Sequence, residues 1–394
     1  MRKVQVTLLI AVLWLVAVML AGCAQSSTQP GGSNPSGGTN TSGGGQAAGT
    51  TPQPNTAAPA SGSGNLQQVT VVVPRTVEVL DDAHIWSAIK MGYFAEEGLE
   101  VKIEQSFGTT DTKMVALKNA QFALPSPNFL FMGIENGLPL KAVFQNDSIN
   151  IFGMAVRTDS GIKTWEDMKG KKVALGDAAW ANIINPTLIA AGLDPEKDVE
   201  YVVAGENRFQ MVQEGKLDIL FTWVAEYSQL KGQGFDFEYI DGNEILPYTS
   251  NPLVTNAEYL TEDPEMVRKF VRALAKGMYF VKMNPEAAAD LTLEQFPSIK
   301  IPWDGAVGAM MGRVYQGFGL NEADQKKIVD GGIGIADMDK WKLNMDWAVK
   351  TGIIQKEIPL DQVVTNDFVD TTWDKAKVEA DAKNYVFKVK DKYQ

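Results

Sequence analysis

The order of secondary-structure patterns is the feature that most constrains the fold of this chain. Short runs rich in β-branched residues predict strands at 69–73, 99–104, 172–175, 199–203 and 218–221. Between them lie stretches of helical periodicity, such as 110–119 and 180–191. Strands that alternate with helices form parallel sheets with helices on their faces. The sequence therefore predicts an α/β fold with parallel sheets.

The pattern changes beyond Thr255, where nearly every segment has helical periodicity. Asp263 and Pro264 precede one amphipathic segment, and Asn284 and Pro285 precede the next. An Asp or Asn cap followed by proline in the first turn is a typical helix start. We therefore expect a helical C-terminal tail that packs on the α/β core.

The first residues have the features of a secretory signal. Two basic residues precede an uncharged, mostly apolar run over 4–22, and two small residues stand directly before Cys23. A run of about 20 apolar residues can also span a bilayer, so an uncleaved anchor is the alternative. The small residues before the cysteine resemble bacterial lipoprotein signals, in which this cysteine is acylated and becomes the new N-terminus. The resemblance implies a signal peptide at 1–22 and a lipid, such as palmitate, on Cys23.

The segment after Cys23 has the composition of a linker. Residues 24–74 carry no charge, and up to about Gly64 they are almost all Ser, Thr, Gly, Pro, Ala, Gln and Asn. Such a segment cannot bury enough apolar surface to offset its conformational entropy. We predict a disordered tether over 23–65, which would let a folded domain reach away from a membrane.

Net charge and single-residue counts exclude several functions. The chain has 36 basic and 48 acidic residues, a net charge of −12, which opposes binding to nucleic acid. His84 is the only histidine and Cys23 the only cysteine, so no intrachain disulfide, thiolate metal site or cysteine nucleophile can form. The acidic pairs at 81–82 and 96–97 lack EF-hand spacing. We therefore predict no enzyme activity, no cofactor and no metal.

Several motifs resemble one family of transport proteins. Residues 86–101 read WSAIKMGYFAEEGLEV and residues 160–173 read SGIKTWEDMKGKKV. They are similar to the A-x-x-x-G-Y-F-x-x-x-G-L-x-V and S-G-I-k-t-l-x-D-L-K-G-K-x-V patterns of solute-binding proteins for sulfonates, nitrate and thiamine-type pyrimidines. AGLDP at 191–195 and EGKLD at 214–218 resemble further signatures of that family. The likeness fades after about Pro297, and it does not place the helices from Trp303 onward.

The resemblance implies a type-II periplasmic-binding fold, in which two α/β lobes are joined by two crossover strands that act as a hinge. Lobe one would comprise 66–154 and 253–394, and lobe two would comprise 155–252. The ligand would lie in the cleft between them, beyond the carboxyl ends of the strands. The candidate ligand-binding residues in the loops at those ends are Asp82, Trp86, Thr109, Thr110, Ser126, Asn128, Asn182, Trp223, Glu226 and Asn251.

The cleft loops contain several carboxylates and aromatic rings, with Arg75 and Arg208 only near them. A carboxylate such as Glu226 beside an aromatic such as Trp223 suits a flat heterocycle that donates hydrogen bonds, and repels an anion. We therefore predict an aminopyrimidine-like nitrogen heterocycle as the ligand. A sulfonate, taurine or nitrate anion is the alternative.

The family resemblance implies a monomeric, lipid-anchored solute-binding subunit on the outer face of the cell membrane. Its partners would be a small-molecule ligand, an ABC permease and the ATPase of that permease. An extracellular sensor domain is the second possibility. Pyrimidine synthases that resemble the same fold carry a cysteine-rich motif and a reactant histidine, and this chain has no cysteine after Cys23.

Overall fold

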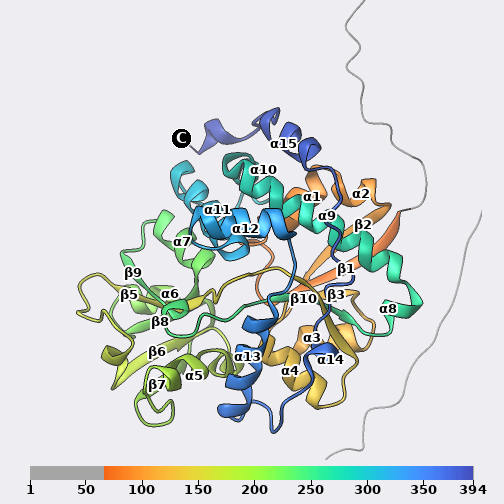
Figure 1. Ribbon diagram of the computed structural model, residues 1–394. Coiled ribbons are helices and arrows are strands. Elements are labelled where there is room, and N and C mark those ends of the chain that lie inside the picture. The colour runs from red at the N-terminus through yellow and green to blue at the C-terminus, as the bar shows by residue number, and fades with distance from the viewer. Residues whose placement is uncertain (1–65, 394) are drawn as a thin grey trace, which may run out of the picture. The chain divides into compact units, whose positions relative to one another are not determined.

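The computed structural model describes residues 66–393. The predicted signal peptide, the lipidation site Cys23 and the tether up to residue 65 lie outside the described residues. Within 66–393 the strands form two five-stranded sheets that are covered by helices (Figure 1). We call the first sheet with the helices packed on it the first lobe, and the second sheet with its helices the second lobe.

The first sheet has the strand order β2-β1-β3-β10-β4. Its strands are β1 (Gln67–Val73), β2 (Leu99–Gln105), β3 (Phe122–Ala123), β4 (Leu140–Gln145) and β10 (Pro252–Asn256). β1 runs parallel to β2 and β3, whereas β10 runs antiparallel to β3 and β4. β10 therefore begins at the edge where the other four strands end.

The second sheet has the strand order β7-β6-β8-β5-β9. Its strands are β5 (Phe152–Arg157), β6 (Lys171–Leu175), β7 (Val199–Val203), β8 (Ile219–Trp223) and β9 (Phe237–Asp241). β6 is parallel to β7 and β8, and β5 is antiparallel to β8 and β9.

Both sheets are mixed, so the expectation of parallel sheets is wrong for β5 and β10. These are the first strands that follow each passage between the sheets. The chain passes from the first sheet to the second over 146–151 and returns over 242–251. Each strand enters its new sheet from the edge that faces the other sheet, so it runs against its neighbours. The predicted lobe boundaries at 154/155 and 252/253 stay predictions.

The α/β part contains seven helices among residues 66–250. They are α1 (Ala83–Lys90), α2 (Tyr93–Glu96), α3 (Thr110–Ala116), α4 (Pro127–Glu135), α5 (Ala181–Ala190), α6 (Arg208–Gln213) and α7 (Val224–Gly232). Gly92 joins α1 to α2 with a φ of 81°, a conformation that a residue with a Cβ adopts at a cost. The GYF motif thus forms a tight turn that inserts the buried Tyr93 and Phe94 into the core.

The C-terminal part is helical, as predicted. Its helices are α8 (Tyr259–Glu262), α9 (Pro264–Met283), α10 (Pro285–Gln295), α11 (Trp303–Phe318), α12 (Glu322–Gly331), α13 (Met338–Lys350), α14 (Leu360–Val363) and α15 (Lys375–Lys383). The side chain of Asp263 accepts a hydrogen bond from the Met266 amide, and that of Asn284 accepts one from the Ala287 amide. Both predicted N-caps are confirmed.

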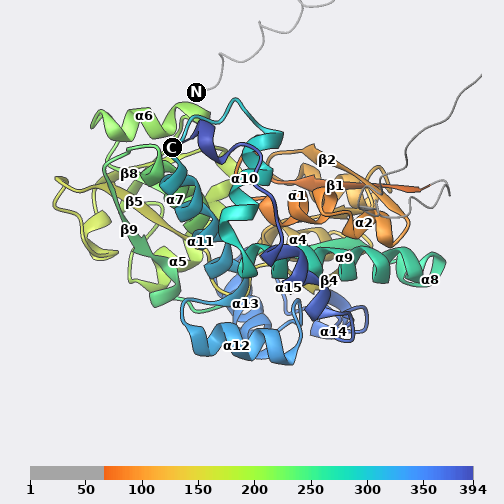
Figure 2. The same cartoon turned by 90° about the horizontal axis from the view of Figure 1, so that it is seen from above.

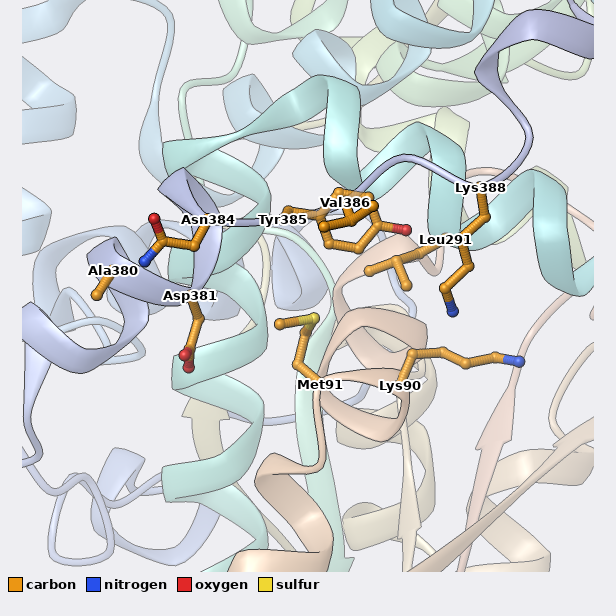
Figure 3. Close-up of a pocket in the computed structure, with 9 residues that line it drawn as sticks. All are labelled: Lys90, Met91, Leu291, Ala380, Asp381, Asn384, Tyr385, Val386 and Lys388. Carbon is orange, nitrogen blue, oxygen red and sulfur yellow. The ribbon is translucent and has the colours of Figure 1, made fainter. Parts of the chain in front are cut away.

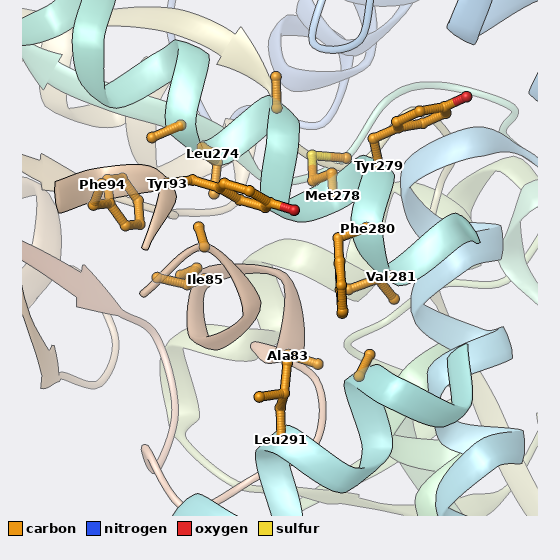
Figure 4. Close-up of a cluster of buried hydrophobic side chains, with 14 of the residues drawn as sticks. Ala83, Ile85, Tyr93, Phe94, Leu274, Met278, Tyr279, Phe280, Val281 and Leu291 are labelled. Carbon is orange, nitrogen blue, oxygen red and sulfur yellow. The ribbon is translucent and has the colours of Figure 1, made fainter. Parts of the chain in front are cut away.

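The tail packs mainly on the first lobe. The apolar face of α9 lies against α1, where Leu274, Met278 and Phe280 meet Ala83 and Ile85 in one buried cluster (Figure 4). α13 packs against α4, and its Trp341 indole donates to Gln145 Oε1 at the end of β4 (2.8 Å).

One tail helix also contacts the second lobe. In both views of the ribbon, α11 lies beside α7 (Figures 1 and 2), and close contacts between the two helices agree with this placement. Within residues 66–393, no helix is both long and apolar enough to cross a membrane.

Candidate ligand-binding site

A cavity of about 250 Å³ lies between the two lobes. The first lobe contributes residues that follow β1 and β2, and the second contributes residues that follow β6, β7 and β8. The charged and aromatic side chains around it are Arg75, Glu78, Asp81, Phe107, Trp180, Glu206, Arg208, Phe209, Trp223, Glu226 and Phe235. The cavity therefore lies beyond the carboxyl ends of strands from both sheets, which is where ligands bind in open α/β folds.

The second lobe supplies an arginine–glutamate pair. Arg208, at the start of α6, places Nη2 2.6 Å from Glu226 Oε1, and Thr222 Oγ1 donates to Glu226 Oε2 at 2.6 Å. The Arg208 guanidinium also lies over the rings of Trp180 (5.1 Å) and Phe209 (4.0 Å). These contacts fix the charged groups before any ligand arrives.

Glu226 is a weaker acid than an exposed glutamate. Burial raises its pKa from 4.5 to about 7, although Arg208 and Thr222 oppose this shift. The carboxyl group therefore changes its charge near neutral pH. It can accept a hydrogen bond from a ligand when ionised and donate one when protonated.

Two tryptophans form a corner of the cavity wall. Trp180 precedes α5 and Trp223 ends β8, and their rings meet edge to face at a centroid distance of 5.9 Å and an angle of 81°. Both side chains are largely buried, yet both line the cavity. Flat aromatic surfaces of this kind bind planar ligands by stacking.

The first lobe supplies a second group of charges. Arg75, just after β1, places Nε 3.1 Å from Asp81 Oδ2 and Nη2 2.5 Å from Asp82 Oδ1. The Trp223 indole of the second lobe donates to the same Asp81 Oδ2 at 2.9 Å. Burial raises the pKa of Asp82, although Arg75 opposes the shift. The charged cluster of Arg75, Asp81 and Asp82 in the first lobe thus contacts the second lobe, through Trp223, at the cavity wall.

Two further hydrogen bonds join the lobes. The Leu80 amide of the first lobe donates to Gln229 Oε1 of α7 (3.1 Å). Asn128 Nδ2 of α4 donates to the carbonyl oxygen of Asn182 in α5 (2.7 Å). Together with the bond from Trp223 to Asp81, these contacts hold the lobes together in this structure.

Of the ten residues predicted to bind ligand, Trp223 and Glu226 line this cavity. Asp82 lies behind the wall, where it pairs with Arg75. Trp86 is partly buried and packs edge-on against Phe296 at 5.1 Å, on the core of the first lobe.

The other predicted residues lie at the same strand ends but outside the cavity lining. Thr109 occupies the N-cap position of α3 and Thr110 begins that helix, and Ser126 caps α4 by accepting from the Asn128 amide. The Asn251 carbonyl oxygen accepts from the Asp147 amide. A ligand role for these residues and for Asn128 and Asn182 stays a prediction.

The structure adds Arg208, Arg75, Asp81 and Trp180 to the candidate site. The prediction from strand ends omits the residues that follow 199–203, where Arg208 begins α6. The same rule applied to that strand finds Arg208. Trp180 falls in a loop that the rule includes, but a single tryptophan is more often a core residue. Arg75 comes two residues after the end of β1, close to the predicted residues Asp82 and Trp86 in the sequence.

The only histidine, His84, does not line the cavity. It is fully buried in α1, and burial together with the positive charges of Arg313 and Arg75 lowers its pKa well below its usual value. Among residues 66–393, no group of three or more His, Cys, Asp or Glu side chains is placed to hold a metal ion.

A second, more open cavity of about 370 Å³ lies on the first lobe (Figure 3). Lys90 and Met91 at the end of α1 face Tyr385 and Lys388 of the C-terminal segment across it. The Tyr385 hydroxyl is already bonded to Asp290 (2.8 Å). Every lining residue belongs to the first lobe or its tail, so a relative movement of the lobes would not enclose a ligand there.

Solved structures share this architecture. The alkanesulfonate-binding protein SsuA from Xanthomonas axonopodis pv. citri bound to MOPS superimposes with a TM-score of 0.59 at 12% identity, over 77% of this chain and 99% of that chain. The fold is therefore the type-II periplasmic-binding fold, with two α/β lobes and a helical C-terminal tail, as predicted.

Sequence comparison then identifies the family. Residues 81–288 match the family described as NMT1/THI5 like, and this range covers more than half of the 394 residues. The chain belongs to this family, and the resemblance to solute-binding proteins of the pyrimidine and sulfonate type is confirmed.

Individual relatives include binding proteins and enzymes. The riboflavin-binding protein RibY of Chloroflexus aurantiacus is 26% identical over 80% of this chain and 90% of its own length. The formylaminopyrimidine-binding protein of Halalkalibacterium halodurans is 23% identical over 69% of this chain and 84% of its own. A relative from Legionella pneumophila, named as a 4-amino-5-hydroxymethyl-2-methylpyrimidine phosphate synthase, is 22% identical over 55% of this chain and 70% of its own.

Proposed function

We propose that this protein is the extracytoplasmic solute-binding subunit of an ABC-type importer, and that it holds a flat nitrogen heterocycle between its lobes without chemical change. The observation that carries the proposal is the cavity between the lobes, which has aromatic walls and charged groups from both sheets. The binding proteins for riboflavin and formylaminopyrimidine among its relatives support the same role. Monomeric protein would deliver the ligand to a permease and its ATPase.

The charges around the cavity favour a heterocycle over an anion. Two arginines, Arg75 and Arg208, face four carboxylates, Glu78, Asp81, Glu206 and Glu226. Both arginines already pair with carboxylates, so little positive charge remains for a sulfonate or nitrate. A planar heterocycle can stack on the tryptophan corner and exchange hydrogen bonds with Glu226. Flavins and aminopyrimidines both have this chemistry.

Two features support binding without catalysis, although synthases occur among the relatives. The histidine at position 84 is buried and kept neutral by its surroundings. The residues that line the cavity include no cysteine.

Calorimetric titration tests the ligand class. We expect micromolar or tighter binding of riboflavin or 4-amino-2-methylpyrimidine, and no binding of taurine, ethanesulfonate or nitrate. Glu226→Gln should weaken the binding about tenfold, equal to about 1.4 kcal/mol. Glu238 is exposed, so Glu238→Gln is the control: it removes one carboxyl group at a position outside the cavity. Binding of a sulfonate or nitrate, with no response to heterocycles and no loss in Glu226→Gln, would overturn the ligand proposal.

The proposal includes a lipid on Cys23 after removal of residues 1–22, so that the protein is held at the outer face of the membrane. Metabolic labelling with palmitate should mark the wild-type protein, and Cys23→Ala should abolish the label and leave the precursor unprocessed. Wild-type protein without label, shed into the medium as freely as the variant, would contradict lipid anchoring.

A further inference from the structure

Arg313 is a buried arginine in α11, a helix outside the residues 81–288 that match the family. Its side chain is only 2% exposed. A guanidinium has five N–H donors, and burying them without partners is costly, so its contacts show what this residue holds in place. Arg313 does not line the ligand cavity.

The first contacts of Arg313 are with the segment where the chain leaves the first sheet. Its Nη2 lies 2.6 Å from Asp147 Oδ1 and donates to the Asn146 carbonyl oxygen at 2.9 Å. The Asp147 carbonyl oxygen accepts in turn from Thr249 Oγ1 (2.8 Å) and the Ser250 amide (3.1 Å), where the chain returns. Arg313 is therefore anchored to the point where both interlobe connections are joined.

A further contact of Arg313 leads to the cavity wall. Its Nη1 lies 3.7 Å from Oδ1 of the Asp81 carboxylate. The other oxygen of that carboxylate, Oδ2, accepts the hydrogen bond from the Trp223 indole. Asp81 comes from the first lobe and Trp223 from the second, and both line the cavity. Asp81 is 4% exposed, so its attraction to Arg75 and Arg313 is only weakly screened by solvent.

The helix that carries Arg313 is itself held against the second lobe. A Cβ on Gly305 of α11 would lie 2.6 Å from the Gly232 Cα of α7, and one on Gly312 would lie 3.2 Å from the Ala225 Cα. Such close backbone contact leaves no room for α11 to shift towards α7. The same α7 presents Glu226 and Gln229 to the cavity.

We propose that Arg313 is a positioning residue for the ligand site: through Asp81 it fixes the Trp223 indole in the cavity wall, and through Asp147 it couples this contact to the two interlobe connections. The helical tail thereby takes part in ligand capture. The effect on ligand affinity rests on the function proposed above, whereas the effect on the Trp223 indole does not.

A double-mutant cycle measures the coupling. Riboflavin and 4-amino-2-methylpyrimidine are titrated into wild-type protein, Arg313→Gln, Arg313→Lys, Trp223→Phe and the double variant Arg313→Gln/Trp223→Phe. We expect Arg313→Gln to weaken binding at least tenfold and Arg313→Lys to recover most of the loss, because it restores the charge near Asp81. In the Trp223→Phe background, Arg313→Gln should weaken binding less than threefold. The proposal would be overturned if the affinity loss in the double variant equals the product of the two single losses. It would also be overturned if Arg313→Gln lowers the melting temperature and leaves the affinity unchanged.

A measurement without ligand separates this proposal from the choice of ligand. The hydrogen-exchange rate of the Trp223 indole N–H is followed by ¹⁵N NMR in wild-type protein, Arg313→Gln and the control Arg268→Gln, an arginine of α9 with a 41% exposed side chain. We expect at least tenfold faster exchange in Arg313→Gln alone. If wild-type protein binds neither probe, the proposed ligand class is wrong, and the exchange rates still decide the role of Arg313.

A second pair of variants tests the same contact if Arg313→Gln does not fold. Gly305→Ala forces α11 away from α7, whereas Gly308→Ala on the same helix meets nothing within 4 Å. Faster indole exchange in Gly305→Ala than in Gly308→Ala supports positioning by α11. Equal exchange rates in both variants and in wild-type protein would overturn it.

Discussion

Two buried arginines near the cavity, Arg208 and Arg313, are equally inaccessible but differ in where their partners lie. Each side chain is 2% exposed. Arg208 contacts Glu226, Trp180 and Phe209, which all belong to the second lobe. Arg313 contacts the start of the interlobe connection and the Asp81 loop, from a helix of the C-terminal tail.

This difference divides the site into a preformed half and an assembled half. The arrangement of Arg208 with Glu226 needs only the second lobe, so it should persist if the lobes separate. The cluster around Asp81 needs the first lobe, the tail and the Trp223 indole of the second lobe together. We therefore propose that ligand recognition begins on the second lobe and that closure of the lobes completes the wall.

The largest expected effect is on stability, and it separates the two arginines. Arg313→Met leaves Asp81, Asp82 and Asp147 buried with Arg75 as their remaining cation, so unfolding free energy should fall by about 3–5 kcal/mol. Arg208→Met should cost only about 1–2 kcal/mol, because Glu226, with a pKa of about 7, can take up a proton near neutral pH. Urea denaturation at pH 7 measures both.

Arg268 has an exposed side chain, so Arg268→Gln is the control for this comparison. It should change the unfolding free energy by less than about 0.5 kcal/mol. Equal losses in Arg313→Met and Arg208→Met would contradict the distinction between the two halves. A larger loss in Arg208→Met would reverse it.

A smaller effect concerns the pH dependence of the preformed half. The pKa of Glu226 is raised in the folded protein, from 4.5 to about 7, so the folded state binds a proton that the unfolded state releases. The stability linked to Glu226 is therefore fully present below about pH 4.5 and is lost as the pH rises to about 7. A tenfold difference in proton affinity between the two states corresponds to about 1.4 kcal/mol. Glu226→Gln should remove this part of the pH dependence.

Denaturation curves at pH 5, 6, 7 and 8 measure the slope of stability against pH. Burial also raises the pKa values of Asp82 and Asp147, so these groups make stability fall with rising pH in the same way as Glu226. Only the difference between wild-type protein and Glu226→Gln therefore reports on Glu226. Glu238→Gln is the control. A slope that is the same in wild-type protein and Glu226→Gln between pH 5 and 7 would show that the Arg208 pair keeps Glu226 ionised.

Features set by neighbouring residues follow from the sequence. The helix starts at Asp263 and Asn284 depend on a side chain that reaches an amide three residues ahead, and both form as predicted. The strand at 199–203 agrees with its prediction because β-branched residues favour extended backbone. The antiparallel entry of β5 and β10 depends on where the chain passes between sheets, and no local pattern encodes it.

The sequence by itself determined the α/β class, the helical tail, the family motifs and two cavity residues, Trp223 and Glu226, because each depends on local periodicity, caps or position after a strand. Only the tertiary structure decided that Arg208 and Arg75 reach the cavity already paired with carboxylates, and that Arg313 from the tail contacts Asp81. Asp81 and Arg313 are 232 residues apart in the sequence and 3.7 Å apart in space. Long-range charge pairing depends on how whole elements pack, and a single sequence carries no local signal of it.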